Sequence, residues 1–206
     1  ESSIVVGVDN INNYYDQKLK RARNKILKKH KNYKFKKIDI KNYKKLESVF
    51  KKNKFECIIN LAAQAGVRYS LINPKSYIDN NIVGFFNVID LAKKYKVKKI
   101  IYASTSSIYG IQNKFPIKEN FDTNNPIQLY AATKKSNEVI AASYSKLYNI
   151  NTIGLRFFTV YGPWGRPDMA LFKFTKNILK GKQIDVFNKG KHTRDFTFID
   201  DIVDGI

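Results

Sequence analysis

The sequence predicts an α/β fold with a doubly wound parallel sheet, followed by the beginning of a smaller domain. Along residues 1–160, short apolar segments rich in Ile and Val alternate with segments of helical periodicity. One apolar segment, over 99–103, stops abruptly in four hydroxyl residues, at the kind of strand end that lines a ligand crevice in parallel sheets. After residue 160 the alternation changes, so we expect a domain boundary there.

The first half of the expected sheet has three strands and two helices. In chain order we expect strands over 2–8, 33–40 and 55–62, and helices over 14–29 and 43–52. The third strand is an apolar run, which is typical of a buried strand. Its Cys57 is therefore expected to be a small buried side chain. As a single cysteine it cannot form an internal disulfide, which fits a reduced cytoplasm.

The second half continues the same pattern. Asn73 before Pro74 is typical of a helix start, so a long helix is expected over 74–96. A strand from Lys99 and a helix over 128–148 follow. The remaining expected elements are a strand over 152–158, a helix over 169–179 and short strands over 184–187 and 195–199.

Composition excludes several classes of protein. The chain has 206 residues and is 43% hydrophobic, which is enough for a sizeable core. No apolar stretch reaches the roughly 18 residues of a membrane span, and no signal segment is present at the start, so no membrane partner is expected. His30 and His192 are isolated, so no metal site is expected.

The net charge of +21 comes mainly from Lys scattered along the chain. Asn, Ile, Tyr and Phe are abundant as well, and these residues share AT-rich codons with Lys, so genome composition explains the charge. We therefore expect no nucleic-acid partner. A basic surface would still attract a diphosphate substrate.

Two motifs carry chemistry. Tyr130 and Lys134 are four residues apart on an expected helix, so their side chains share one face. A neighbouring cation stabilises phenolate, which would let Tyr130 take a proton from a hydroxyl, as alcohol oxidation by hydride transfer requires. The alternative is an ordinary surface pair. Ser104, Thr105, Ser106 and Ser107 end the strand before this helix and could donate to the same oxygen; alternatively they only cap the strand.

Further segments carry a resemblance to a known family: 60–63, 104–110, 130–134, 155–163 and 194–201. They resemble the NAD-dependent epimerase/dehydratase family of the extended short-chain dehydrogenase/reductase superfamily. Residues 63–70 and 162–170 resemble, more narrowly, the UDP-glucuronate 4-epimerases of that family. The resemblance runs essentially end to end and implies a Rossmann-like fold.

One departure from the family concerns the start of the chain. Family members open with a strand and a GxxGxxG turn that lets the cofactor pyrophosphate approach the backbone, and this sequence has neither. We therefore expect an internal fragment that binds cofactor poorly and is inactive alone. The resemblance assigns residues 1–160 to an NAD-binding domain and 161–206 to the beginning of a nucleotide-sugar domain, with 195–206 returning to the first domain.

The resemblance implies NAD as the cofactor. Asp9 would accept hydrogen bonds from the adenosine ribose and disfavour NADP, although by itself it could equally cap a turn before Asn10. The positions that match cofactor contacts of the family are Asp9, Asn10, Asp39, Ile40, Leu61, Ala62, Ala63, Asn81, Tyr130 and Lys134.

The implied reaction is 4-epimerisation of UDP-glucuronate to UDP-galacturonate through a 4-keto sugar. Tyr130 would act as the base, with Lys134 beside it and Thr105 bonded to the same oxygen. Dehydratases of this family usually carry Asp-Glu after that Thr. Ser106 and Ser107 stand there in this chain and argue against dehydration.

Arg166 would hold the glucuronate carboxylate, because a guanidinium reads carboxylates in a two-point contact. Its alternative is an ion pair with Asp168. The positions that match substrate contacts are Thr105, Ser106, Ser107, Thr159, Arg166, Phe187, Arg194 and Arg68.

Two alternatives stay open: a related UDP-hexose or UDP-N-acetylhexosamine 4-epimerase, and an inactive nucleotide-binding fragment. The family also implies a cytoplasmic isomerase of polysaccharide biosynthesis. By analogy the helices over 74–96 and 128–148 would pair in a homodimer.

Overall fold

The computed structural model describes residues 3–191 and 193–206, which divide into two compact units. The first unit comprises residues up to Asn10 together with Asn32–Phe157. The second unit comprises Ile11–Lys31 together with the described residues from Phe158 onward. The expected domain boundary near residue 160, and the role of each domain, stay predictions.

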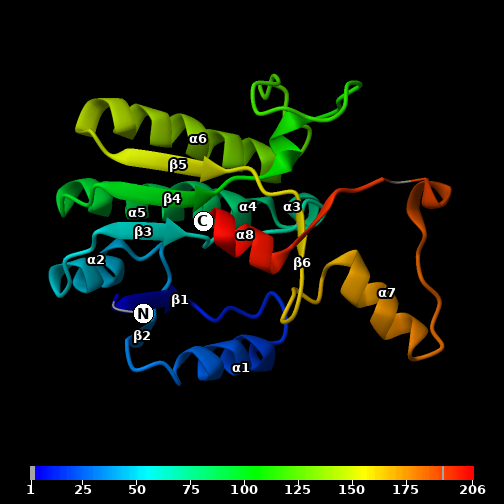
Figure 1. Cartoon of the computed structure of the whole chain (residues 1–206), viewed down its shortest axis with the longest axis horizontal. Coiled ribbons are helices and arrows are strands. Elements are labelled where there is room, and N and C mark those ends of the chain that lie inside the picture. Colours follow the sequence, from blue (N-terminus) through cyan, green and yellow to red (C-terminus); the bar gives the residue numbers. More distant parts are fainter. Residues whose placement is uncertain (1–2, 192) are drawn as a thin grey trace. The chain divides into compact units, whose positions relative to one another are not determined.

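Parallel strands form the framework of the first unit (Figure 1). Strand β1 (Val5–Asp9) pairs in parallel with β2 (Tyr33–Lys37). Strands β3 (Cys57–Asn60), β4 (Lys99–Ala103) and β5 (Asn151–Leu155) form a second parallel sheet with β4 in the centre. The parallel pairing matches the sheet that the sequence predicts.

Helices connect these strands. They are α2 (Tyr43–Lys51), α3 (Tyr69–Ile72), α4 (Pro74–Tyr77), the π-helical turn η1 (Ile78–Val83), α5 (Gly84–Lys94), the 3-10 turn η2 (Ser106–Tyr109) and α6 (Leu129–Tyr148). The Asn73 side chain accepts the backbone N–H of Ser76 at 3.3 Å, so the predicted N-cap is confirmed. The single helix expected over 74–96 is instead interrupted by η1.

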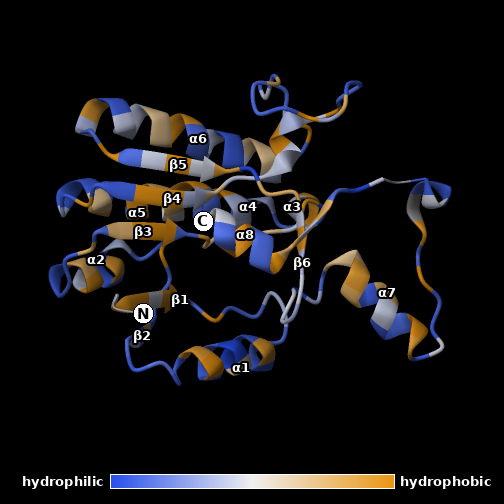
Figure 2. Cartoon of the chain, viewed as in Figure 1, coloured by the Kyte–Doolittle hydropathy of each residue, from blue (hydrophilic) through white to orange (hydrophobic). Residues whose placement is uncertain are grey.

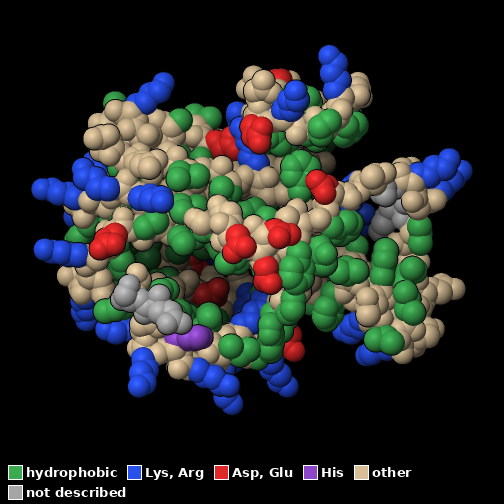
Figure 3. All heavy atoms as spheres, in the orientation of Figure 1, with side chains coloured by type: hydrophobic (Ala, Val, Ile, Leu, Met, Phe, Trp, Pro, Cys, Tyr) green, Lys and Arg blue, Asp and Glu red, His purple; other side chains and the backbone are tan. Residues whose placement is uncertain are grey.

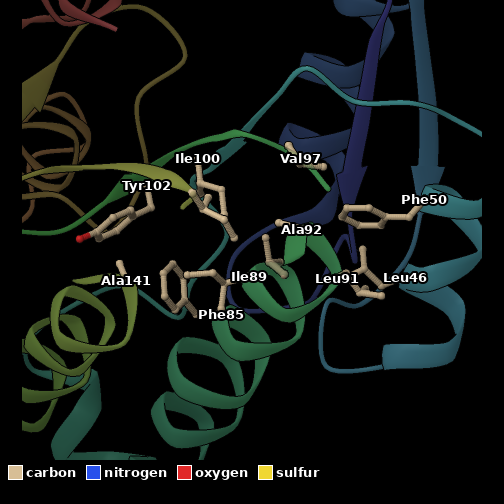
Figure 4. Packing of buried hydrophobic residues seen from close by; sticks show 12 residues of the cluster. Leu46, Phe50, Phe85, Ile89, Leu91, Ala92, Val97, Ile100, Tyr102 and Ala141 are labelled. Atoms are coloured by element: carbon tan, nitrogen blue, oxygen red, sulfur yellow. The ribbon is translucent and has the colours of Figure 1, made fainter. Parts of the chain in front are cut away.

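The core of the first unit lies between β4 and the helices α2, α5 and α6 (Figure 4). Phe85, Ile89 and Leu91 of α5 are almost completely buried. Phe85 and Ile89 lie toward Tyr102 and Ile100 of β4, whereas Leu91 lies beside Leu46 of α2. Each such side chain stabilises the fold by about 1.5–3 kcal/mol through removal of apolar surface from water. This packing fixes α5 and the central strand, whose end carries the hydroxyl residues.

Strand β3 is less buried than its composition suggests. Figure 2 shows hydrophobic colours along β3, yet Cys57 is exposed and Ile59 is 53% exposed. The expectations of a buried strand and a buried Cys57 are therefore wrong. The reason is that β3 is hydrogen-bonded to β4 on one side only among the described residues.

The second unit contains a smaller set of elements. They are α1 (Gln17–Leu27), β6 (Thr159–Tyr161), α7 (Ala170–Ile178), η3 (Phe187–Gly190), β7 (Phe196–Phe198) and α8 (Ile199–Gly205), with β6 parallel to β7. The strand expected over 184–187 is wrong. Residues 182–186 are irregular, and Asn188 and Lys189 in η3 have positive φ angles of 51° and 52°, which strands do not accommodate.

The described residues contain neither a membrane-spanning helix nor a cluster of metal-binding side chains. None of their helices is long and apolar enough to cross a bilayer. Within the same residues no group of three or more His, Cys, Asp or Glu side chains is arranged to hold a metal ion. His192 lies outside the described residues.

Candidate active site

Helix α6 presents the predicted base to the end of β4. It begins after Gln128, whose backbone is extended, and ends at Asn149 in the left-handed conformation. Lys134 is buried, and its Nζ donates a hydrogen bond of 2.8 Å to the carbonyl oxygen of Ala103, the last residue of β4. Tyr130 lies one turn earlier, half-buried, with its ring edge-on to the ring of Tyr77 at 6.0 Å. Lys134 therefore belongs to the interior, so the two residues are not an ordinary surface pair.

Burial decides the electrostatics of Lys134. Removal of its ammonium group from water lowers the pKa of Lys134 from 10.5 to about 8. At pH 7 the protonated form still outnumbers the neutral form by about ten to one. A cation is thus present one helical turn after Tyr130, and its effect on the Tyr130 phenol stays a prediction.

The hydroxyl residues after β4 form a compact turn. The backbone of Ser106 donates to the Phe157 carbonyl at 2.9 Å, which extends the pairing beyond β5. Thr105 is buried and caps η2: its Oγ1 accepts the backbone N–H of Ser107 at 3.2 Å. The Thr105 hydroxyl also donates to the Ser107 hydroxyl at 3.2 Å. The structure thus brings these three hydroxyl residues together in η2, which packs against α6.

The sequence interpretation missed an ion pair behind this turn. Glu138 on α6 pairs with Arg156, which directly follows β5, at 3.0 Å. Glu138 also accepts the Ser104 hydroxyl at 2.6 Å. The signal in the sequence was the spacing, because Glu138 lies four residues after Lys134 and therefore on the same helix face.

The ends of β1 and β2 bring together four positions that match cofactor contacts of the family. The Asn10 side-chain amide donates to the Asp39 carboxylate at 3.1 Å, and the backbone N–H of Ile38 donates to the Asp9 carbonyl at 3.1 Å. The carbonyl of Ile40 accepts the side chain of Asn87 at 2.9 Å. These contacts hold the ends of β1 and β2 together, and a cofactor contact of the four residues stays a prediction.

The segment after β3 is held differently. Leu61 is 56% exposed and Ala62 is also exposed, whereas Ala63 is half-buried. Asn81 of η1 is buried: its amide accepts the backbone N–H of Gln64 at 2.7 Å and donates to Thr133 Oγ1 of α6 at 3.0 Å. Asn81 thus ties this segment to α6, and its contact with a cofactor stays a prediction.

In the second unit Arg166 is engaged by a carboxylate of the same chain. Its Nε and Nη2 donate to the two oxygens of Asp168 at 2.9 and 2.6 Å. The Tyr14 hydroxyl donates to Asp168 as well, at 3.1 Å. Burial alone would raise the pKa of Asp168, but the bonds from Arg166 and Tyr14 outweigh it and the pKa is lowered. The alternative ion pair considered for Arg166 is therefore present.

The remaining candidate substrate residues are more scattered. Thr159 begins β6, and Arg194 is exposed and donates to the carbonyl of Thr193 at 2.7 Å. Phe187 begins η3, but its side chain lies outside the described part of the chain. Arg68, in the first unit, is exposed and precedes α3. Their contacts with a substrate stay predictions.

A parallel α/β sheet whose central strand ends in hydroxyl residues beside a Tyr-x-x-x-Lys pair with a buried Lys defines the extended short-chain dehydrogenase/reductase class. Residues 4–206 match the sequence profile of the NAD dependent epimerase/dehydratase family. The chain belongs to that family, as its motifs predict.

Individual relatives agree with this assignment. The chain is 54% identical over 202 residues to Protein CapI of Staphylococcus aureus and 50% identical over 206 residues to a probable UDP-glucuronate 4-epimerase of Rhizobium meliloti. These matches cover 98% and 100% of this chain but 60% of each relative's length. The crystal structure of UDP-glucuronic acid 4-epimerase from Bacillus cereus, in complex with UDP-glucuronic acid and NAD, superposes with a TM-score of 0.90 at 35% identity. The superposition covers 98% of this chain and 63% of the Bacillus cereus chain, and it confirms the predicted fold class.

Proposed function

We propose that the whole protein is an NAD-dependent UDP-sugar 4-epimerase that converts UDP-glucuronate into UDP-galacturonate. The observation that carries the proposal is the contact of Lys134 with the last carbonyl of β4. This contact holds the first turn of α6, which contains Tyr130, near the end of β4. Thr105 follows the same end of β4 in the chain. The choice of reaction is supported by the Rhizobium meliloti relative and the Bacillus cereus structure, which are both named as UDP-glucuronate 4-epimerases.

The residues at the strand ends fit a dinucleotide. Asp9 and Asp39 are carboxylates that can accept ribose hydroxyls, and they lie beside the Asn10 amide. The exposed side chains of Leu61 and Ala62 offer a smooth, mostly apolar surface after β3. When bound there, NAD would supply a reversible acceptor for the hydride of the sugar C4 carbon.

The acid-base chemistry falls to α6 and the hydroxyl turn. Tyr130 takes the proton of the sugar 4-hydroxyl as that carbon is oxidised, and Lys134 favours the phenolate electrostatically. Thr105 donates a hydrogen bond to the same oxygen and fixes its position. After the 4-keto sugar has turned over in the site, Tyr130 returns the proton to the oxygen while the hydride returns to the other face of C4. Because both the proton and the hydride are given back, the reaction has no net redox change.

The choice of UDP-glucuronate rests on the guanidinium of Arg166, which can bind a carboxylate at two points. A glucuronate 4-ketone is a β-keto acid, which loses carbon dioxide when its carboxylate rotates out of the ring plane. A firm hold on the carboxylate by a guanidinium prevents this loss.

Turnover of UDP-glucuronate by the purified whole protein tests the proposal. We expect UDP-galacturonate to form without added NAD, with products separated by chromatography or identified by NMR. Tyr130→Phe should lower kcat by at least about 100-fold because the variant lacks the acid-base hydroxyl. Tyr148→Phe, on the same helix, is the matched control and should turn over normally. Equal activity of the two variants would disprove the role of Tyr130.

A second candidate is 4-epimerisation of a neutral UDP-hexose or a UDP-N-acetylhexosamine. The ion pair of Arg166 with Asp168 favours it, because a carboxylate of the chain already satisfies part of the guanidinium. Arg166→Met separates the candidates. With UDP-glucuronate as the natural substrate, the variant should lose about 1.5–3 kcal/mol of binding to the carboxylate, a 10- to 100-fold fall in kcat/KM. The second candidate would be supported if wild type preferred UDP-glucose or UDP-N-acetylglucosamine to UDP-glucuronate. In that case Arg166→Met should turn over the preferred substrate as fast as wild type does.

A further inference from the structure

We propose that the Glu138–Arg156 ion pair is a positioning device that holds the hydroxyl turn 104–109 against α6, so that Thr105 meets the substrate oxygen next to Tyr130. The inference rests on the proposed function, because it assigns these two residues to the same reaction. The sequence motifs assign no role to either residue, and neither is proposed to touch the substrate.

Glu138 fixes the beginning of the turn. Its Oε1 accepts the hydroxyl of Ser104 at 2.6 Å, while the Ser104 backbone N–H donates to the carbonyl of Leu155 at 2.8 Å. Ser104 is therefore held from its side chain by α6 and from its backbone by β5. Because Thr105 is the next residue, little freedom is left for its backbone.

Arg156 fixes the end of the turn. Its Nη1 donates to the Tyr109 hydroxyl at 3.1 Å and to the Glu119 carbonyl at 2.7 Å, and its guanidinium lies 5.1 Å from the Tyr109 ring. Tyr109 is the last residue of η2. With the Nε and Nη2 of Arg156 each 3.0 Å from Glu138, one ion pair contacts both ends of the segment that contains Thr105.

The same ion pair fixes the register of α6. Tyr130, Lys134 and Glu138 follow one another at intervals of four residues and so share one face of the helix. Lys134 bonds to Ala103 and Glu138 to Ser104, which are consecutive residues at the end of β4. Two successive anchors of this kind prevent α6 from sliding along the strand, and Tyr130 is the next residue on that face.

The charge of Glu138 is maintained under neutral conditions. Burial alone would raise the pKa of Glu138, but the hydrogen bonds from Arg156 and Ser104 outweigh burial and leave the pKa lowered. Glu138→Gln therefore removes a real charge at neutral pH while it keeps nearly the same shape. Glu138→Gln therefore tests the ion pair itself, because the packing of the side chain hardly changes.

Hydrogen exchange of the chain tests positioning without any need for activity. We expect Glu138→Gln to speed exchange of the Ser106 and Ser107 backbone amides by about tenfold or more, as these amides depend on the turn. The matched control is Glu47→Gln. Glu47 is equally buried, with 13% of its side chain exposed against 14% for Glu138, and it pairs with Lys94 at 2.6 Å away from the turn. Equal exchange in both variants at these amides would overturn the proposal.

Steady-state kinetics of the whole protein then test the link to catalysis. We expect Glu138→Gln to lower kcat about 10- to 100-fold with little change in KM, because misplacing Thr105 matters most in the transition state. Glu138→Asp, which keeps the charge, should recover part of kcat, and Glu47→Gln should keep it all. A melting temperature lowered in both glutamine variants with kcat unchanged would show a purely structural ion pair. If the wild-type protein epimerises no UDP-sugar, the proposed function is wrong. The hydrogen-exchange experiment still tests whether the ion pair holds the turn, because it does not depend on activity.

Discussion

At the scale of single residues, the burial of Lys134 makes the stability of the fold depend on pH. The pKa of Lys134 is about 8 in the folded chain and 10.5 in an exposed reference state. Below pH 8 both states carry the proton, so folding bears the full cost of burying the charge. Between these two values the unfolded state binds more protons, so this cost falls as pH rises.

We therefore expect a pH-dependent difference between wild type and Lys134→Met. From pH 7 to pH 9.5 the unfolding free energy of wild type should rise relative to the variant by about 2 kcal/mol, which follows from the two pKa values. Urea denaturation at both pH values measures this difference. Lys146→Met removes a Lys from an exposed part of the same helix and serves as the control. If the unfolding free energy of wild type relative to Lys134→Met fell as pH rises, burial would not lower the pKa of Lys134.

Single residues also show where sequence reasoning works. Tyr130 and Lys134 could be predicted as neighbours because helical spacing alone places them together. Glu138 and Arg156 could not, because 18 positions separate them and only the packing of α6 beside β5 brings them into contact. Cys57 was predicted to be buried from its apolar neighbours, but composition does not reveal how many strands flank β3.

At the scale of elements, the helical segment over 74–94 shows the limit of periodicity. A helical pattern predicts its extent well, from the Asn73 cap onward. It does not reveal the π-helical turn η1, which contains Asn81 and joins α4 to α5. Turns of this kind occur often at functional sites, and here the turn carries the side chain that connects the segment after β3 to α6.

Asn81 should be the most sensitive position of η1. Asn81→Leu leaves the backbone N–H and carbonyl of Gln64 without their bonds of 2.7 and 3.1 Å, and both atoms are in a buried setting. We expect a loss of about 2–6 kcal/mol of unfolding free energy, since each of the two unsatisfied groups costs about 1–3 kcal/mol. Asn80→Leu is the control, since Asn80 only bonds to the Ser76 carbonyl one turn earlier. Chemical denaturation compares the two, and a smaller loss at Asn81 than at Asn80 would contradict this account.

Short strands are a further limit at this scale. Residues 184–187 alternate in polarity like the residues of a strand, yet no described strand pairs with them. Residues 159–161 have much the same local character and do form β6, because β7 offers a partner. Alternation therefore predicts a strand only where another strand is within reach, and that depends on tertiary structure.

At the scale of the whole molecule, the fold class was predictable because alternation of strands and helices restricts a chain to few architectures. The grouping of residues 11–31 with the C-terminal part into one unit was not predicted. It depends on contacts such as that of Arg23 with the carbonyl oxygens of Trp164 and Gly165, more than 100 positions away. Such contacts leave no local pattern in the sequence.

The charge of the molecule also belongs to this scale. Lys and Arg side chains are spread over the face drawn in Figure 3 and do not form one continuous stripe. A net charge of +21 gives the chain a general attraction for anions such as the diphosphate of a sugar nucleotide.

The exposed edge of β3 has a consequence for handling the purified chain. Ile59 in β3 is 53% exposed and Leu61, which follows the strand, is 56% exposed; among the described strands only β4 pairs with β3. Unpaired backbone groups next to exposed aliphatic side chains act as a template for strands of other molecules. In concentrated solution or after long storage, the chain should therefore precipitate or form fibrils from this edge. A low protein concentration and a charged residue at position 59 should extend its shelf life.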